Sequence, residues 1–142
     1  ELEFTYEQRL KLIHSVAKKG VDDHDIPREK RLEIADWIKE VTTSATKDVN
    51  LRTLMRAFKL YDYARDQDID IGGDPWKKLT NELIETDENL YNAREIILSG
   101  EFDTVAQRKK EFKERTGKSG RTFTRARDEL LDKSEKVKEA LS

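Results

Sequence analysis

The chain has 142 residues, of which 41% are charged and 35% hydrophobic, and its formal net charge is −2. This length suits one ordinary domain or two small ones, and the regular spacing of the apolar residues argues against disorder. The absence of cysteine excludes a disulfide framework and a thiolate metal site, and it fits a reducing compartment such as the cytoplasm. No apolar run approaches the ~20 residues of a membrane span, so no membrane partner is expected.

Three helices are expected in residues 1–71. Thr5 and Gln8 form the pattern of a capping box before the first helix, which Gly20 ends. Pro27 suits the first turn of the second helix, and Asn50 is a candidate N-cap for the third. Apolar residues at helical spacing give each helix one buried face: Leu10, Ile13 and Ala17 in the first; Ile34, Trp37, Ile38, Val41 and Ala45 in the second; Leu51, Leu54, Met55, Phe58 and Tyr61 in the third.

The acidic segment from Asp66 to Gly73 ends in two glycines and is predicted to link two halves. After it, helix starts are expected at Asp74-Pro75, at Thr86 or Asp87, near Asp103-Thr104 and at Ser119. The sixth helix should bury Val105 and Phe112. The seventh is expected to be one long helix with Phe123, Ala126, Leu130, Val137 and Leu141 on one side. The sequence therefore predicts an all-α protein of two small helical bundles, residues 1–71 and 72–142.

Charge is distributed very unevenly along the chain. Residues 105–127 contain nine basic and two acidic residues, a net charge of +7, so the rest of the chain sums to −9. A molecule polarised in this way can present a cationic surface to a polyanion. The basic residues of this segment are Arg108, Lys109, Lys110, Lys113, Arg115, Lys118, Arg121, Arg125 and Arg127.

The same segment has the pattern of two helices joined by a short turn. Gly117 is predicted to form the turn and Ser119 to cap the second helix, whose inward residues then leave Arg121 and Arg125 pointing outward. Either guanidinium suits O6 and N7 of guanine, whereas the neighbouring lysines are placed for phosphates. The predicted DNA-binding residues are Lys109, Lys110, Lys113, Lys118, Ser119, Arg121, Thr124, Arg125 and Arg127.

Residues 104–131 resemble the helix-turn-helix found in many phage and bacterial DNA-binding proteins. The match is carried by the turn and the start of the second helix, at Thr116, Gly117, Lys118, Ser119, Arg121, Thr122, Phe123 and Arg125. Two positions depart from that family: Lys113 stands where a small residue is usual, and Lys118 where an apolar one is common. The resemblance implies DNA as the ligand, although the same scaffold also holds proteins. The alternative interpretation is a solvated, charged helical hairpin.

Residues 48–61 resemble the start of the third helix in the lid of AAA+ ATPases, and the likeness spans residues 4–65. In that family an arginine here, the sensor 2 residue, reaches the phosphates of a bound nucleotide; by residue match it is Arg52. The chain lacks a Walker A loop, an acidic Mg-binding strand end and a parallel sheet. By itself it is therefore expected to bind no cofactor and to hydrolyse no ATP. ATP and Mg are expected in a longer protein of which it is the C-terminal part. The alternative is an exposed first-turn arginine in an ordinary three-helix bundle.

Together these features predict the DNA-binding C-terminal region of an AAA+ motor that acts in DNA replication, transposition or partition, in a bacterial cytoplasm or a phage-infected host. DNA is the expected partner, with replication proteins and self-association through the missing ATPase core as further expectations. The alternative function is a protein adaptor that recruits a replication partner, with Trp37, Trp76, Tyr61 and Tyr63 as anchors. An independent enzyme is disfavoured, since no carboxylate is paired with a base or nucleophile, and His14 and His24 are expected to be surface residues without a metal.

Overall fold

The chain is all-α, as the sequence predicts. A computed structural model describes residues 4–21, 24–46, 49–66, 77, 81 and 85–142, and within these ranges it contains seven α-helices and no strand. None of the helices in this part of the chain is long and apolar enough to span a membrane. The chain divides into two compact units, residues 1–86 and 87–142. The predicted linker starts at Asp66, which is instead the last residue of the helix Leu51–Asp66. The rest of the linker, the predicted boundary after Ile71 and the helix start at Asp74-Pro75 lie outside the described residues.

The first helix of unit 1, α1 (Tyr6–Lys19), begins and ends at the residues that the sequence indicates. The Thr5 hydroxyl accepts a hydrogen bond from the Gln8 amide at 3.1 Å, and the Gln8 side chain accepts one from the Thr5 amide at 2.9 Å. Both amides would otherwise be unpaired at a helix start, so the capping box is confirmed. The helix ends at Gly20, whose φ of +87° is strained for any residue with a Cβ atom.

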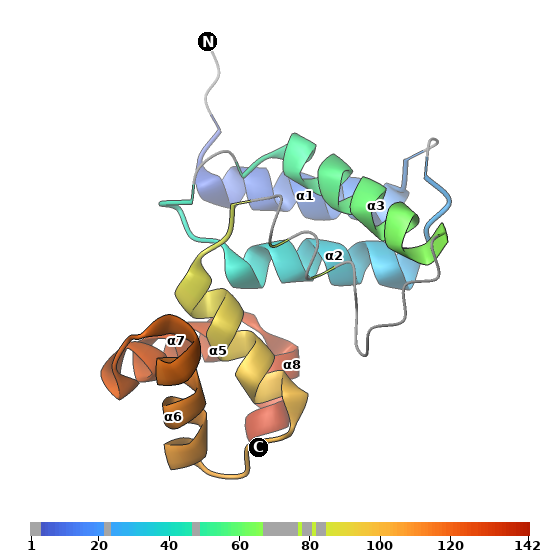
Figure 1. The fold of residues 1–142 in the computed structure, drawn as a ribbon. Helices are drawn as coiled ribbons and strands as arrows, with labels where there is room; N and C mark the ends of the chain where they lie inside the picture. Colours follow the sequence, from blue (N-terminus) through green and yellow to red (C-terminus); the bar gives the residue numbers. More distant parts are fainter. Residues whose placement is uncertain (1–3, 22–23, 47–48, 67–76, 78–80, 82–84) are drawn as a thin grey trace. The chain divides into compact units, whose positions relative to one another are not determined.

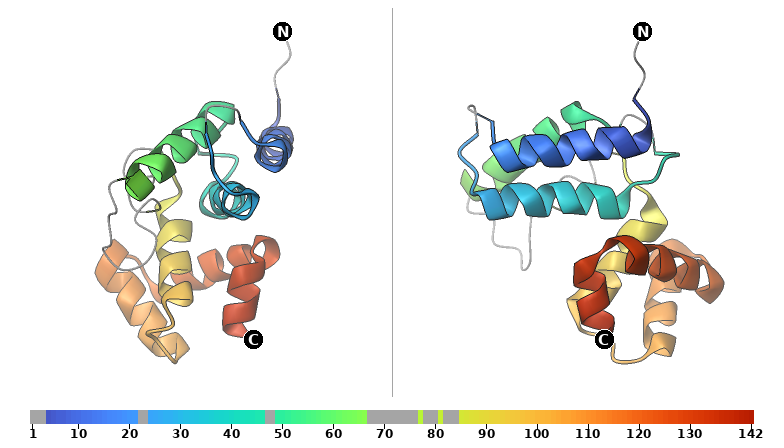
Figure 2. Two further views of the ribbon diagram at one scale, coloured as in Figure 1. Left: turned by 90° about the vertical axis from the view of Figure 1, so that its right-hand side faces the viewer. Right: turned by 180° about the vertical axis from the view of Figure 1, so that it is seen from behind.

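Unit 1 is built from α1, α2 (Arg28–Val41) and α3 (Leu51–Asp66), each of which packs against the other two. Figures 1 and 2 show α1 and α2 side by side, with α3 against the pair. The predicted apolar faces of Ile34, Trp37 and Ile38 and of Leu54 and Phe58 are buried. Ala45 is an exception. It lies beyond the end of α2 at Val41 and is exposed, because Thr42 is already in extended backbone.

Arg31 holds the end of α1 against α2. Its guanidinium donates hydrogen bonds to the backbone carbonyls of Ala17 at 2.7 Å, Ile26 at 2.7 Å and Lys18 at 3.2 Å. Carbonyls at a helix C-terminus have no partner within the helix, and the helix dipole favours a cation there. A Cβ atom at Gly20 would lie 3.1 Å from the Arg31 guanidinium carbon. The glycine therefore serves both the turn and the close approach of this arginine.

Both histidines connect helices of unit 1, which the sequence does not indicate. His14 contacts the Leu10 carbonyl at 2.9 Å and the Asp36 carboxylate of α2 at 3.0 Å. His24 is hydrogen-bonded to Asp62 of α3, and its ring meets the Phe58 ring edge-on. The expectation that both are plain surface residues is therefore wrong in detail, since each is half-buried and bonded across the unit.

We expect His14 to stabilise the folded protein, and we expect this stabilisation to decrease as the pH rises. The hydrogen bond to Asp36, helped by the Leu10 carbonyl and by the charge of Asp36, raises the pKa of His14 above 6.5 despite burial and the nearby Lys39. Because the folded-state pKa is the higher one, the stabilisation is complete below the unfolded pKa of about 6.5 and is lost as the pH rises through the folded-state pKa. Because the His14–Asp36 pair is partly exposed to solvent, its contribution to the free energy of unfolding stays below about 1 kcal/mol.

Urea denaturation of the wild type and of His14→Gln on both sides of that pKa measures this effect. The stability difference between the two proteins should shrink toward alkaline pH. A difference that stays constant over this range would contradict the assignment.

Unit 2 consists of α5 (Glu88–Ser99), α6 (Val105–Thr116), α7 (Gly120–Lys133) and α8 (Glu135–Leu141). The helix predicted to run unbroken from Ser119 to Leu141 is interrupted at Ser134. The Ser134 amide donates to the Leu130 carbonyl at 2.7 Å and closes α7, while its hydroxyl accepts from the Val137 amide at 3.2 Å and opens α8. One buried serine thus ends one helix and caps the next.

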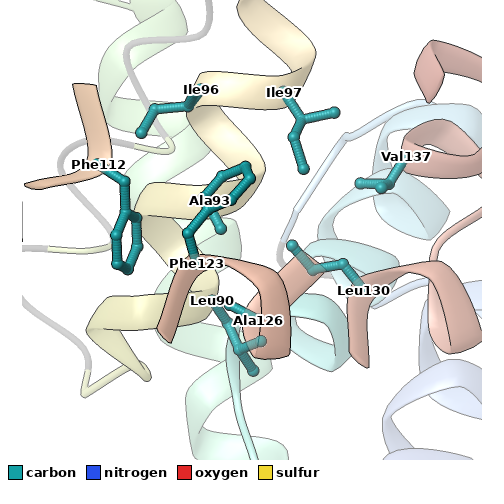
Figure 3. Packing of buried hydrophobic residues seen from close by; sticks show 9 residues of the cluster. All are labelled: Leu90, Ala93, Ile96, Ile97, Phe112, Phe123, Ala126, Leu130 and Val137. Atoms are coloured by element: carbon teal, nitrogen blue, oxygen red, sulfur yellow. The ribbon is translucent and has the colours of Figure 1, made fainter. Parts of the chain in front are cut away.

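The core of unit 2 collects apolar residues from all four helices. Figure 3 shows these side chains converging between α5 and its three neighbours. Phe112 of α6 and Phe123 of α7 meet edge-to-face, with ring centroids 5.5 Å apart. The predicted burial of Val105 is wrong, because the first residue of α6 is 42% exposed. The buried cluster comprises Leu90, Ala93, Ile96, Ile97, Phe112, Phe123, Ala126, Leu130 and Val137.

Candidate nucleic-acid interface

A tight turn joins α6 to α7. Gly117 ends α6 with a φ of +74°, and its amide donates to the Lys113 carbonyl at 2.7 Å. The Thr116 hydroxyl donates to the Phe112 carbonyl at 2.7 Å and accepts from the Lys118 amide at 3.1 Å. The left-handed backbone at Gly117 costs a side-chain-bearing residue about 1–2 kcal/mol, which explains the glycine. Gly117 and Ser119 thus occupy the turn and cap positions that the sequence predicts.

The two helices approach each other closely at Gly120, the first residue of α7. A Cβ atom there would lie 2.9 Å from Cδ of Lys109, so the aliphatic stem of this α6 lysine lies against the start of α7. Lysine commonly covers a neighbouring surface with its stem and keeps the ammonium group in water. The contact places a cation of α6 beside the N-terminus of α7, where the helix dipole is also positive.

Two of the nine predicted DNA-binding residues are cations whose side chains form hydrogen bonds within unit 2. Lys118 Nζ donates to Oδ1 of Asn89 in α5 at 2.8 Å, which ties the turn to the core helix. Arg127 donates to its neighbour Asp128 at 3.1 Å from Nη2 and 3.3 Å from Nε. Both side chains would have to release these partners, or share them, to reach a phosphate.

Two predicted polar residues are also engaged in α7 itself. The Ser119 hydroxyl accepts from the Thr122 amide across a long 3.5 Å, as the N-cap of the helix. The Thr124 hydroxyl donates to the Gly120 carbonyl one turn earlier, at 3.1 Å. Each therefore has a structural role, and Thr124 is only partly exposed.

The other five predicted residues make no ion pair or side-chain hydrogen bond within the described residues. We call them the α6–α7 cations. On α6 the three lysines fall within about 100° of arc, and on α7 the two arginines fall within about 40°. All but Lys109 are exposed. The α6–α7 cations are Lys109, Lys110, Lys113, Arg121 and Arg125.

The outward face of α7 changes sign halfway along the helix. Opposite its buried residues, Arg121 and Arg125 occupy the first two turns, and Asp128 and Asp132 follow at the same angular positions. Asp128 has a 61% exposed side chain even though Arg127 bonds to it. A polyanion lying along the full length of α7 would meet these carboxylates. Contact is therefore favoured only at the N-terminal half of α7, together with α6.

The proposed nucleotide-sensing residue, Arg52, is the second residue of α3. Its amide donates to the Asn50 side-chain oxygen at 2.9 Å, which supports Asn50 as the predicted cap. The guanidinium is exposed and has no ion pair within the described part of the chain. An arginine at a helix N-terminus adds its charge to the positive end of the helix dipole. Its placement therefore suits contact with an anion.

Charged residues inside the molecule are less apparent from the sequence. Arg94 of α5 is 1% exposed, with its guanidinium 3.5 Å from the Glu95 carboxylate. Its position between Leu90 and Ile97 on the apolar side of α5 is the signal that identifies it as buried.

In the described ranges, no cluster of three or more His, Asp or Glu side chains is suited to hold a metal. Comparison of the chain with protein-family models, curated proteins and solved structures finds no match.

Proposed function

We propose that the chain binds duplex DNA through the α6–α7 cations. The observation that carries the proposal is that Arg121 and Arg125 on α7, like Lys110 and Lys113 on α6, are exposed and have no acid partner in the described residues. Long-range attraction to phosphates favours such an unneutralised cluster, and release of counterions adds to the affinity. In this proposal α6, the Gly117 turn and α7 act as a helix-turn-helix with α7 as the reading helix.

The wider role proposed for the chain is the C-terminal region of an AAA+ motor in DNA replication, transposition or partition. Residues 1–71 would form a helical lid in which Arg52 responds to ATP bound with Mg by preceding sequence, and residues 72–142 would tether the motor to DNA. Support for the lid comes from the sequence resemblance and from the exposed position of Arg52 at the start of α3. A Walker A motif encoded upstream of Glu1 would test it directly.

The aromatic residues give the adaptor alternative less support. Trp37 is fully buried in unit 1 and is not available as an interface anchor. Tyr61 is partly buried, with the Arg65 guanidinium over its ring at 5.6 Å, and Trp76 lies outside the described residues. Tyr63 is exposed, but one aromatic residue does not make an interface core. DNA therefore remains the favoured partner.

The salt dependence of duplex binding tests the proposal. If Lys110 and Lys113 each neutralise one phosphate, Lys110→Ala/Lys113→Ala should lower the slope of log affinity against log salt by about 2. The effect should be similar for any duplex sequence, because phosphate contacts carry no sequence information. Fluorescence anisotropy over a salt series measures both quantities.

The matched control is Lys18→Ala/Lys19→Ala, which removes two exposed lysines from α1 in the other unit. The slope of this variant should equal that of the wild type. Duplex affinity that is insensitive to salt, or that the two variants reduce equally, would exclude the α6–α7 cations as the binding surface.

A further inference from the structure

The outward face of α3 carries a second row of cations, far along the sequence from α6 and α7. Successive helical residues turn by about 100°, so Arg52, Arg56, Lys59 and Tyr63 fall within about 60° of arc. All four are exposed, Tyr63 to 54% of its full area. We call these four residues the α3 stripe. The stripe lies opposite the side of α3 that is buried in unit 1, which carries Leu54, Ala57, Phe58 and Ala64.

No acid neutralises the cations of the stripe within the described residues. The first turn of α3 contains no acidic residue. Its two acids come at the end of the helix and are occupied: Asp62 bonds to His24 and to Arg65, and Asp66 lies 3.8 Å from Arg65. An ordinary solvated helix tends to pair charges three or four residues apart. The stripe instead contains three cations in successive turns with no acid between them on the same face.

We propose that the α3 stripe binds a single strand of nucleic acid. The rise of a helix sets Arg52, Arg56 and Lys59 about 6 and 4.5 Å apart along its axis, about 10 Å in all. In a stacked strand with the rise of B-form DNA, successive phosphates advance about 3.4 Å along the axis, so the three cations cover about three phosphate steps.

Tyr63 selects the single strand over the duplex. It lies about 6 Å beyond Lys59 on the same face, and an exposed aromatic ring beside a cationic track provides a platform on which an unpaired base can stack. In a duplex each base is already stacked between its neighbours, so Tyr63 would gain no partner there. The combination of three cations and one ring therefore matches a strand with free bases.

This inference is separate from DNA binding by α6 and α7, since it concerns another helix in the other unit. It also differs from the nucleotide role proposed for Arg52, because the resemblance assigns that role to Arg52 alone and gives none to Arg56, Lys59 or Tyr63. The test therefore leaves Arg52 unchanged and substitutes only the later residues of the stripe. Failure of either proposed role leaves the other intact.

Binding of the full chain to a fluorescent oligothymidylate, measured over a salt series, tests the α3 stripe. Removing one phosphate-binding charge should lower the salt slope by about 0.7, so Arg56→Ala/Lys59→Ala should lower it by about 1.4. Tyr63→Ala should weaken binding about 5-fold or more at high salt, where stacking remains while charge is screened. Tyr63→Phe keeps the ring and should bind as the wild type does.

The matched control, Lys11→Ala/Arg28→Ala, removes two exposed cations from α1 and α2. Thermal unfolding by circular dichroism checks that each variant remains folded. The proposal is overturned if the control weakens oligothymidylate binding as much as the stripe variants do. It is also overturned if the stripe variants change duplex binding but leave single-strand binding unchanged. Weaker binding to polyglutamate with oligothymidylate affinity unchanged also overturns it and identifies an acidic protein as the occupant.

Discussion

Replacing Phe123 with alanine is expected to lower the free energy of unfolding by about 3–5 kcal/mol. The Phe123 side chain of α7 is 0% exposed and packs edge-to-face against Phe112 of α6. Replacing the Phe123 ring with a methyl group leaves a cavity in the buried cluster of unit 2. A small unit has little stability to spare, so a destabilisation of this size should unfold a measurable fraction.

Urea denaturation, with the slope against denaturant checked for constancy, measures the destabilisation. Val105→Ala on the exposed side of α6 is the matched control and should change stability by less than about 0.5 kcal/mol. Phe123→Leu should fall between the two, because it keeps most of the volume. An effect of Phe123→Ala no larger than that of the control would show that the cluster does not carry the stability of this unit.

Local signals account for most of what the sequence predicts correctly. The Thr5 capping box, the Gly20 stop, the Asn50 cap and the Gly117-Ser119 turn each depend on backbone groups within four residues. Such caps can be recognised in a sequence because the residues that satisfy the unpaired groups at a helix end lie only a few positions away. They fix where helices begin and end, and the spacing of apolar residues then fixes which face is buried.

Two wrong predictions arise because a helix that continues and a helix that has ended give the same spacing of apolar residues. Val137 follows Leu130 by seven residues, which is the same face of one continuous helix, so periodicity does not reveal the break at Ser134. Ala45 continues the face of α2 in the same way beyond its actual end at Val41. Val105 has the right spacing to Phe112, but the first residue of a helix has neighbours on one side only and stays exposed.

The candidate site was predictable as a cluster but not in its contacts. Charge counting finds the nine basic residues of 105–127, and the inward phase of α7 correctly leaves Arg121 and Arg125 exposed. Which lysine is engaged depends on residues far away in sequence: Lys118 reaches Asn89 of another helix. The same holds in unit 1 for Arg31 and the carbonyls of α1, since no local pattern links an arginine to a helix end fourteen residues earlier.

We expect the lysines and the arginines among the α6–α7 cations to have different chemical roles, which binding measurements can distinguish. Phosphate contacts by the lysines should set affinity for every sequence, whereas guanidinium pairs with guanine O6 and N7 should set preference. Selection from a random duplex pool identifies a preferred sequence. Lys110→Ala/Lys113→Ala should then weaken preferred and scrambled duplexes by the same factor.

Arg121→Ala/Arg125→Ala should weaken the preferred duplex by about 2–6 kcal/mol, with a much smaller effect on the scrambled one, because each bidentate pair contributes about 1–3 kcal/mol of discrimination. Arg121→Lys/Arg125→Lys is the sharper control. Lysine keeps the charge but lacks the planar fork, so the salt slope should persist while discrimination falls. If the alanine variant discriminates as well as the wild type, the arginines act only as charges and do not read bases. A fall in discrimination at an unchanged slope in the lysine variant would instead place both guanidinium groups at base edges, where the carboxylates of Asp128 and Asp132 confine contact to the first turns of α7.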